Sequence, residues 1–278
     1  MTSPAGPELT NPRAERVKAA RALSGRSARL RTGRFLVEGP QGVREAVREA
    51  PDRVRDLYLT PTAAQRYPEI VTDAADRSVR VRMASEDVVA AMSPDAQGVL
   101  AVVDMHDPGL AAVLAARPRL VAVLARVRDP GNAGTVIRAA DAAGADAVVL
   151  TAESVDVHNP KVVRSTAGSL FHLPVTAGAS LAEVTAALRD AGLGILAADG
   201  AGEHDLDDLL DVAGGSGTVP DLSRPTAWVF GNEAWGLPEA DRALADAVVR
   251  VPIRGRAESL NLATAATVCL YASSRAQR

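Results

Sequence analysis

Residues 226–262 read TAWVFGNEAWGLPEADRALADAVVRVPIRGRAESLNL, and this stretch decides the fold. It contains two short, apolar runs, 226–230 and 247–251, with the composition of buried parallel strands. Each run leads into a loop that contains glycine, and a final helix is expected to start at 260–262. Open α/β sheets bind ligands in the loops at the carboxyl ends of parallel strands. Two such loops in one segment therefore predict a binding site.

The polar residues of these loops stand at characteristic spacings. The first loop carries Asn-Glu-x-x-Gly-Leu from Asn232, and the second ends in Ser259, Leu260 and Asn261. Taken singly, Gly231 is explained as a turn residue, Glu233 as a solvated charge and Asn261 as a residue of the first helical turn. The combination is much less probable by chance, so it indicates function.

These two loops resemble the second and third motifs of the SpoU/TrmH family of RNA ribose 2'-O-methyltransferases, within the SPOUT superfamily. The first motif of that family, Asn-x-Gly-x-x-x-Arg, also occurs, as NAGTVIR over residues 132–138. The three motifs stand in the family's order, and the resemblance covers roughly residues 120–275.

The resemblance implies an α/β fold in which a C-terminal parallel-sheet SPOUT domain with a trefoil knot follows a small L30e-like α/β domain. It implies S-adenosyl-L-methionine as cofactor, a homodimer, and methylation of a ribose 2'-hydroxyl in RNA, with 23S ribosomal RNA favoured. Two alternatives stay open: a 2'-O-methyltransferase of transfer RNA, and a non-catalytic RNA-binding or ribosome-assembly factor with the same fold.

The family pattern also assigns site residues. The residues that match catalytic positions are Arg138, Asn132, Glu233, Ser259 and Asn261, and those that match cofactor-binding positions are Gly231, Val251 and Leu260. Arginine stays protonated in proteins, so fixing a phosphate and the target oxygen is an easier role for Arg138 than acting as a base. Both roles stay open. We also expect Asn132 to cap a helix over 134–143, with Ser259 and Asn261 in the first turn of the last helix.

The chain divides into predicted regions. Residues 1–12 are expected to be disordered, 13–105 to form the L30e-like RNA-binding domain behind a basic helix, 106–118 to be a linker and 119–278 to form the methyltransferase domain. In the first domain, strands are expected at 34–38, 54–59, 79–83 and 97–103, alternating with helices. The segment GRFLVEG at 33–39 resembles the substrate-binding domain of SpoU proteins.

Charge is distributed unevenly along the chain, although the net charge is only −3. Residues 13–34 hold eight basic side chains against Glu15 alone, whereas residues 199–211 are acidic. A basic stripe at one end is typical either of a solvated helix face or of a surface that contacts RNA phosphates. The RNA-binding prediction falls on Arg26, Arg29, Arg31 and Arg34.

Other features narrow the functional class. The single cysteine, Cys269, excludes an intrachain disulfide, and the four histidines lack metal-ligand spacing, so no metal site is predicted. No long apolar run or signal layout occurs, which predicts a cytoplasmic protein without a membrane partner. A nicotinamide-binding fold is disfavoured, because the turn at 129–134 lacks the third glycine of that fingerprint.

Overall fold

The computed structural model describes residues 8–215 and 220–278, and the chain forms two compact units. The first unit contains the chain up to His106 and, in addition, Asp156–His172. The second contains Asp107–Val155 and Leu173–Arg278. Residues 156–172, which were predicted to belong to the second domain, therefore lie in the first unit.

The first unit is built on a mixed four-stranded sheet with the order β1-β4-β2-β3. The central strand β4 pairs antiparallel with β1 and β2, and β3 adds parallel to β2. The strands are β1 (Arg34–Glu38), β2 (Val54–Leu59), β3 (Val81–Met83) and β4 (Val99–Asp104). The helices are α1 (Glu15–Ala22), α2 (Arg26–Thr32), α3 (Pro40–Glu49), α4 (Pro61–Arg66), α5 (Pro68–Asp76), α6 (Glu86–Met92) and α9 (Pro160–Ser165).

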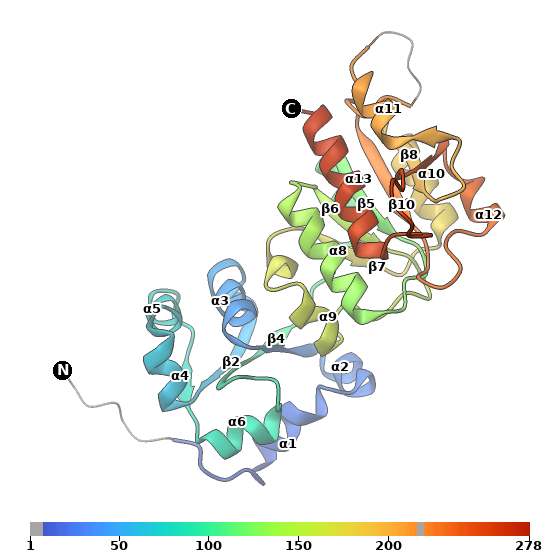
Figure 1. Ribbon diagram of the computed structural model, residues 1–278. Helices are drawn as coiled ribbons and strands as arrows, with labels where there is room; N and C mark the ends of the chain where they lie inside the picture. Colours follow the sequence, from blue (N-terminus) through green and yellow to red (C-terminus); the bar gives the residue numbers. More distant parts are fainter. Residues whose placement is uncertain (1–7, 216–219) are drawn as a thin grey trace. The chain divides into compact units, whose positions relative to one another are not determined.

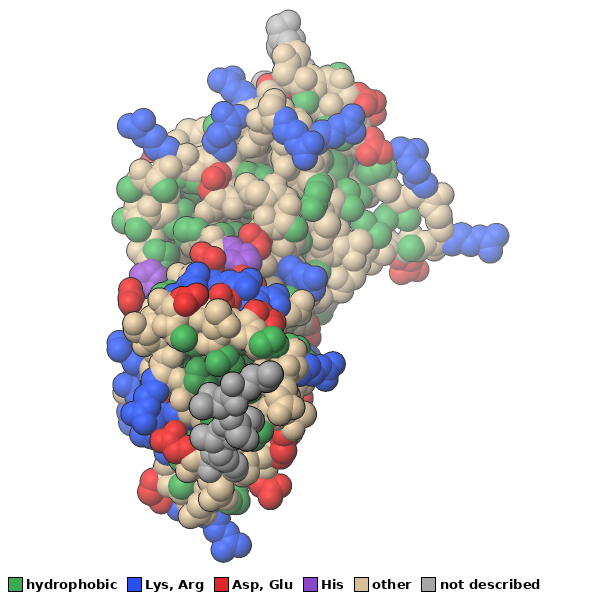
Figure 2. All heavy atoms as spheres, turned by 90° about the vertical axis from the view of Figure 1, so that its left-hand side faces the viewer, with side chains coloured by type: hydrophobic (Ala, Val, Ile, Leu, Met, Phe, Trp, Pro, Cys, Tyr) green, Lys and Arg blue, Asp and Glu red, His purple; other side chains and the backbone are tan. Residues whose placement is uncertain are grey.

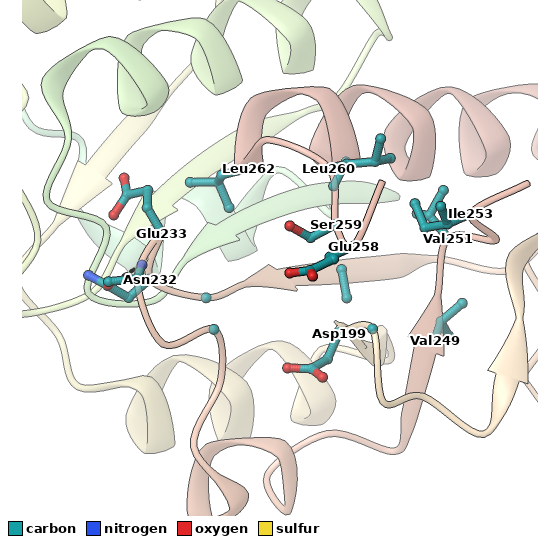
Figure 3. Close-up of a pocket in the computed structure, with 16 residues that line it drawn as sticks. Asp199, Asn232, Glu233, Val249, Val251, Ile253, Glu258, Ser259, Leu260 and Leu262 are labelled. Atoms are coloured by element: carbon teal, nitrogen blue, oxygen red, sulfur yellow. Dashed lines mark hydrogen bonds between the residues drawn. The ribbon is translucent and has the colours of Figure 1, made fainter. Parts of the chain in front are cut away.

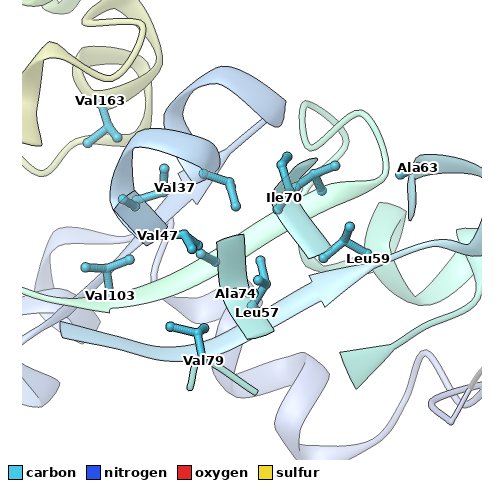
Figure 4. Close-up of a cluster of buried hydrophobic side chains, with 14 of the residues drawn as sticks. Val37, Val47, Leu57, Leu59, Ala63, Ile70, Ala74, Val79, Val103 and Val163 are labelled. Carbon is cyan, nitrogen blue, oxygen red and sulfur yellow. The ribbon is translucent and has the colours of Figure 1, made fainter. Parts of the chain in front are cut away.

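Both faces of this sheet are buried, because its strands alternate between two apolar clusters. One cluster joins Phe35, Val37, Leu57 and Leu59 with side chains of α3 and α5. The other joins Leu36, Tyr58, Leu100 and Val102 with α1 and α6. The first cluster also includes Val163 from the segment 156–172, and Figure 4 shows this side chain beside the strands and helices that it packs against.

Polar contacts as well as Val163 hold the segment 156–172 in the first unit. The Arg29 guanidinium donates to the Asp156 carboxylate at 2.7 Å, and Arg164 donates to Glu38 at 2.6 Å. The rings of Phe35 and His158 lie 4.6 Å apart between centroids. Asp156–His172 is therefore an integral part of the first unit's fold.

The second unit is a seven-stranded, entirely parallel sheet with the order β7-β6-β5-β10-β8-β11-β9. The strands are β5 (Leu120–Leu124), β6 (Ala147–Leu150), β7 (Val175–Ala177), β8 (Gly194–Ala198), β9 (His204–Asp205), β10 (Thr226–Phe230) and β11 (Ala247–Arg250). The helices are α7 (Gly109–Ala115), α8 (Pro130–Ala142), α10 (Leu181–Asp190), α11 (Leu206–Asp211), α12 (Glu239–Arg242) and α13 (Leu262–Ala276). Figure 1 shows α13 lying along α8, which it contacts.

The order of the strands explains the position of the binding loops. Strand β10, which is late in the chain, lies in the middle of the sheet between β5 and β8, and every residue of it is buried. The loops after β5, β8, β10 and β11 therefore leave from the same edge of the sheet. The predicted α/β fold with a C-terminal parallel sheet is confirmed, whereas the trefoil knot and the L30e likeness stay predictions.

Several predicted elements match and others need correction. The strands predicted at 34–38, 54–59 and 226–230 match, whereas those predicted at 79–83 and 97–103 form with shifted ends, as β3 and β4. Helix α2 was not predicted, because the sequence analysis gave this region one basic helix, whereas Gly25 precedes the first residue of a second one. Helix α8 starts four residues earlier than expected, with Pro130 in its first turn, where proline is favoured.

The predicted disorder at 1–12 lies partly outside the described residues, which begin at Glu8. Within the described part the expectation is wrong, because Leu9 pairs with Ala84 and exchanges backbone hydrogen bonds with Met83 and Ser85. Across residues 8–215 and 220–278, no helix is both long enough and apolar enough to cross a bilayer.

The buried ion pair of Arg29 and Asp156 makes a prediction about stability. Arg29→Ala leaves the Asp156 carboxylate buried without its cation, so we expect the free energy of unfolding of the first unit to fall by ~3–5 kcal/mol. The matched control is Arg29→Met with Asp156→Leu, which removes both charges and should recover most of the loss. Urea unfolding with hydrogen exchange measures both, and wild-type stability in Arg29→Ala would contradict the prediction.

The same pair predicts the direction of a pH effect. Burial raises the pKa of the Asp156 carboxyl, but the hydrogen bond and charge of Arg29 and the His158 amide outweigh it, so the pKa lies below its ordinary value. The pair's contribution is therefore fully present above the ordinary Asp pKa of about 3.9 and is lost as the pH falls through the folded value.

Candidate active site

A cavity of about 320 Å³ opens at the carboxyl edge of the parallel sheet in the second unit. Its walls come from the loops after β8, β10 and β11 and from the start of α13. In Figure 3 the apolar side chains of Val249, Val251 and Ile253 lie on one side of the view, and Asn232 and Glu233 lie on the other. The remaining wall residues include Asp199, Gly231, Gly236, Glu258, Ser259, Leu260, Leu262 and Ala265.

The loop after β10 is folded tightly on itself. The backbone amide of Asn232 donates to the carbonyl of Gly236 at 3.0 Å, and the reverse bond measures 2.8 Å. A β-carbon at Gly231 would overlap the carbonyl of Gly236 and the side chain of Leu237. Gly236 itself has a φ of +63°, which favours glycine. Both glycines are thus required by the shape of the loop, which brings its backbone to the cavity.

Glu233 ties this loop to the loop that follows β5. Its carboxylate accepts hydrogen bonds from the backbone amides of Arg128 at 3.3 Å and Asp129 at 3.1 Å. It also accepts from the side-chain amide of Asn132 at 3.4 Å. A second tie runs beside it, because Asn232 Nδ2 donates to the carbonyl of Arg126 at 2.8 Å. The two loops therefore form one hydrogen-bonded structure.

Asn132 extends this network to the last helix. Its Oδ1 accepts a hydrogen bond from Asn261 Nδ2 at 3.0 Å. The expectation that Asn132 caps its helix is wrong: Asp129 is the cap, and its Oδ1 accepts from the Asn132 backbone amide at 2.7 Å. With capping done by Asp129, the side chain of Asn132 is available to join Glu233 and Asn261.

Asn261, not Ser259, caps the last helix. Its Oδ1 accepts from the amides of Ala263 and Thr264, so α13 begins at Leu262. Ser259 precedes the helix and lines the cavity, so the expectation that both lie in the first turn is wrong. The side chain of Asn261 thereby performs two tasks, because its oxygen caps α13 while its nitrogen reaches Asn132.

The predicted site residues fall into three groups. Five line the cavity: Gly231, Glu233, Val251, Ser259 and Leu260. Asn132 and Asn261 are joined to them through Glu233. Arg138 stands apart: it is exposed on α8, does not line the cavity, and has no hydrogen-bond or ion-pair partner among the described residues of its unit.

Sequence reasoning missed Asp199. This carboxylate follows β8 at the same edge of the sheet, is 14% exposed, and lies 3.7 Å from the guanidinium of Arg242. Its position after a buried strand would have identified it, had the central place of β8 in the sheet been known. With Glu233 and Glu258 it gives the cavity an acidic lining.

The predicted RNA-binding arginines of the first unit are not equivalent. Arg26, Arg31 and Arg34 are exposed, and Arg34 lies 3.4 Å from Asp104. Arg29 is 2% exposed and is committed to Asp156 and to two backbone carbonyls, so the prediction that it contacts RNA is wrong. Figure 2 shows basic and acidic side chains interspersed on one face, so individual exposed arginines matter more than net charge.

Comparison with known proteins agrees with this geometry. The model of the SpoU rRNA Methylase family matches residues 119–271. A second family model, described as RNA 2'-O ribose methyltransferase substrate binding, matches residues 36–109.

Curated relatives match over nearly their whole length. A 23S rRNA (uridine(2479)-2'-O)-methyltransferase of Streptomyces viridochromogenes is 33% identical, over 96% of this chain and 96% of its own. A 23S rRNA (guanosine(2553)-2'-O)-methyltransferase, RlmP, of Bacillus subtilis is 32% identical, over 95% and 98%.

Solved structures match equally well. An AdoMet-bound rRNA methyltransferase from Sinorhizobium meliloti superposes with a TM-score of 0.78 at 29% identity, covering 96% of this chain and 97% of that one. The SpoU methyltransferase AviRb from Streptomyces viridochromogenes, in complex with AdoMet, gives 0.77 at 34% identity, covering 94% and 98%.

The parallel sheet, with a cavity at its carboxyl edge and a late strand at its centre, defines an α/β protein of the methyltransferase class represented by these structures. Within that class, the chain belongs to the SpoU rRNA methylase family. The resemblance carried by the three sequence motifs is confirmed.

The role of Glu233 as a tie between loops can be tested by hydrogen exchange. Glu233→Ala removes the acceptor of the Arg128 and Asp129 amides, so we expect both amides to exchange faster while amides of β5 and β10 keep their protection. The control is Glu239→Ala, which removes an exposed carboxylate of α12. Unchanged exchange at Arg128 and Asp129 in Glu233→Ala would show that the tie is not formed in solution.

Proposed function

We propose that this protein uses S-adenosyl-L-methionine to methylate a ribose 2'-hydroxyl in RNA, with 23S ribosomal RNA as its substrate. The observation that carries the proposal is the network of Glu233, Asn132 and Asn261, which joins all three family motifs at the edge of one cavity. The names of the curated relatives support ribosomal over transfer RNA. They specify different bases, so the nucleotide is not inferred.

The cavity fits the proposed cofactor. Its volume of about 320 Å³ is within the usual range for small-molecule sites, roughly 300–1,000 Å³. Gly231, Val251 and Leu260 would hold the cofactor through backbone groups, with Ile253 adding apolar surface. The carboxylates of Asp199 and Glu258 suit a ligand that carries positive charge. When bound, the cofactor supplies a methyl group activated by its attachment to a sulfonium.

The chain's own residues would orient and activate the acceptor. Asn132 is fixed at both ends of its amide, because Glu233 accepts from its nitrogen and Asn261 donates to its oxygen. A side chain held in this way can orient a neighbouring group, and correct orientation of the reacting groups lowers the barrier of a displacement reaction. The guanidinium of Arg138 would bind the RNA phosphate and stabilise negative charge developing on the ribose oxygen.

Homodimerisation through the second unit and a cytoplasmic location belong to the proposal. Val268 and Tyr271 leave α13 with exposed apolar surface, at 39% and 47% exposure. An interface along α13 would cover this apolar surface in a homodimer.

Arg138 provides a sharp test of the methylation mechanism. We expect Arg138→Ala to lower the rate of methyl transfer to 23S ribosomal RNA by on the order of 10²-fold or more, because a charge that stabilises the transition state is lost. Affinity for S-adenosyl-L-methionine, measured by calorimetry, should change little. Arg275→Ala, an exposed arginine of α13, is the control. Loss of cofactor binding in Arg138→Ala would contradict the assigned role.

The same assays distinguish the non-catalytic alternative. If the wild-type chain binds ribosomal RNA but neither binds the cofactor nor transfers methyl groups, then the protein is an RNA-binding or assembly factor. Methylation of transfer RNA in preference to ribosomal RNA would favour the other alternative.

The exposed arginines of α2 test RNA binding by the first unit. Arg26→Ala with Arg31→Ala should weaken binding to ribosomal RNA and reduce the slope of log affinity against log salt by roughly 1–2, if each arginine contacts one phosphate. Arg77→Ala with Arg80→Ala removes the same charge from exposed positions elsewhere in the unit and should have a smaller effect. Equal effects of the two double variants would show that α2 is not part of the RNA-binding surface.

A further inference from the structure

Trp235 is a large aromatic side chain that the proposed reaction does not yet use. It lies in the loop after β10, where Gly231, Asn232, Glu233, Ala234 and Gly236 all line the cavity and Trp235 does not. Trp235 is 51% exposed, whereas the protein's other tryptophan, Trp228, is fully buried and donates to Ser273. A half-exposed indole loses much of the stabilisation that burying its apolar surface would give. Packing within the protein therefore does not explain why a tryptophan stands at position 235.

Hydrogen bonds fix the loop on both sides of Trp235. On its N-terminal side, Asn232 Oδ1 accepts from the Ala234 amide at 2.9 Å, and Asn232 Nδ2 donates to the loop after β5. On its C-terminal side, Gly236 closes the turn through two backbone bonds to Asn232. An aromatic ring that is exposed on a hydrogen-bonded turn loses little conformational freedom when a ligand stacks on it.

Arg128 lies beside Trp235 and adds a positive charge to it. Its guanidinium lies over the Trp235 ring, 5.5 Å from the centroid, and its backbone amide is held by Glu233. Arg126 and Arg242 are paired with Asp241 and Asp199, respectively. By contrast, no carboxylate pairs with Arg128 among the described residues of this unit. A cation and an indole are therefore stacked at the surface without a neutralising acid, which favours a polyanionic aromatic partner.

We infer that Trp235 and Arg128 form a stacking subsite for an unpaired nucleobase of the RNA substrate, beside the nucleotide whose ribose is methylated. The base stacks on the open surface of the indole, and Arg128 lies within reach of the phosphate attached to that nucleotide. Single-stranded RNA is commonly recognised in this way, by unstacked bases on aromatic and guanidinium planes. The inference rests on the proposed function and adds a substrate-positioning residue to it.

Stacking is tolerant of base identity, because every base has a π-face. The subsite would therefore hold the RNA strand without choosing the base, which must be read elsewhere. Loss of one stacked base corresponds to on the order of ten- to a hundredfold in RNA affinity.

The first test is kinetic and uses the full chain with 23S ribosomal RNA from cells that lack the gene. Trp235→Leu should raise the KM for RNA about tenfold or more. The affinity for S-adenosyl-L-methionine, measured without RNA, should be unchanged. Trp235→Phe keeps an aromatic face and should retain most of the wild-type KM. A wild-type KM for RNA in Trp235→Leu would overturn the inference, as would equal defects in both variants.

The second test is spectroscopic and does not depend on turnover. Adding the same RNA to the wild-type chain should quench tryptophan emission, and Trp235→Phe, which keeps only the buried Trp228, should show little quenching. Equal quenching in the two proteins would overturn the inference. So would a loss of self-association in Trp235→Leu in sedimentation of the protein alone, because the ring would then contact a second copy of the chain. If the wild-type chain shows RNA-dependent quenching but no methylation, the proposed function fails while the stacking subsite stands.

Discussion

The architecture of the site depends on one carboxylate. Glu233 accepts hydrogen bonds from two backbone amides of the loop after β5 and from the Asn132 side chain in the first turn of α8, although more than one hundred residues separate these groups from it along the chain. The bond from Asn261 to Asn132 then attaches the start of α13 to the same cluster. These contacts are possible because β10 inserts next to β5 in a parallel sheet, which brings both loops to one edge. Without Glu233, the loops after β5 and β10 would be joined in this network only by the bond from Asn232 to the Arg126 carbonyl.

The loop after β10 connects the proposed cofactor cavity with the proposed RNA-binding surface. The glycines of the loop after β10 shape the cavity from inside, whereas the neighbouring Trp235 faces outward beside Arg128. One short turn thus contributes to both the proposed cofactor cavity and the proposed RNA surface. The position of one with respect to the other is set by the backbone bonds between Asn232 and Gly236. A change in the backbone of this turn, unlike a change confined to the Trp235 side chain, would alter both sites.

Much of the fold could be predicted from local patterns, but the partners of individual residues could not. Strands such as β5 and β10 are apolar runs bounded by turn residues, so their ends were predictable. The beginning of α8 was misplaced because Asn132 and Asp129 are both good caps, and only the Pro130 rule separates them. Arg29 was predicted to be one of the basic surface residues. Its guanidinium instead pairs with Asp156, which lies 127 residues further along the chain. Such contacts follow from tertiary packing, which periodicity does not encode.

The return of Asp156–His172 to the first unit has a consequence for biosynthesis. Val163 belongs to the same apolar cluster as Phe35 and Leu57, so that cluster stays incomplete until this segment has left the ribosome. By then β5 and β6 of the second unit have already emerged. The first unit can therefore complete its fold only after residue 172 has emerged, and not directly after His106, where an uninterrupted N-terminal domain would be finished. A nascent chain stalled between positions 106 and 156 would lack Val163 and would leave the apolar surface of this cluster exposed to chaperones.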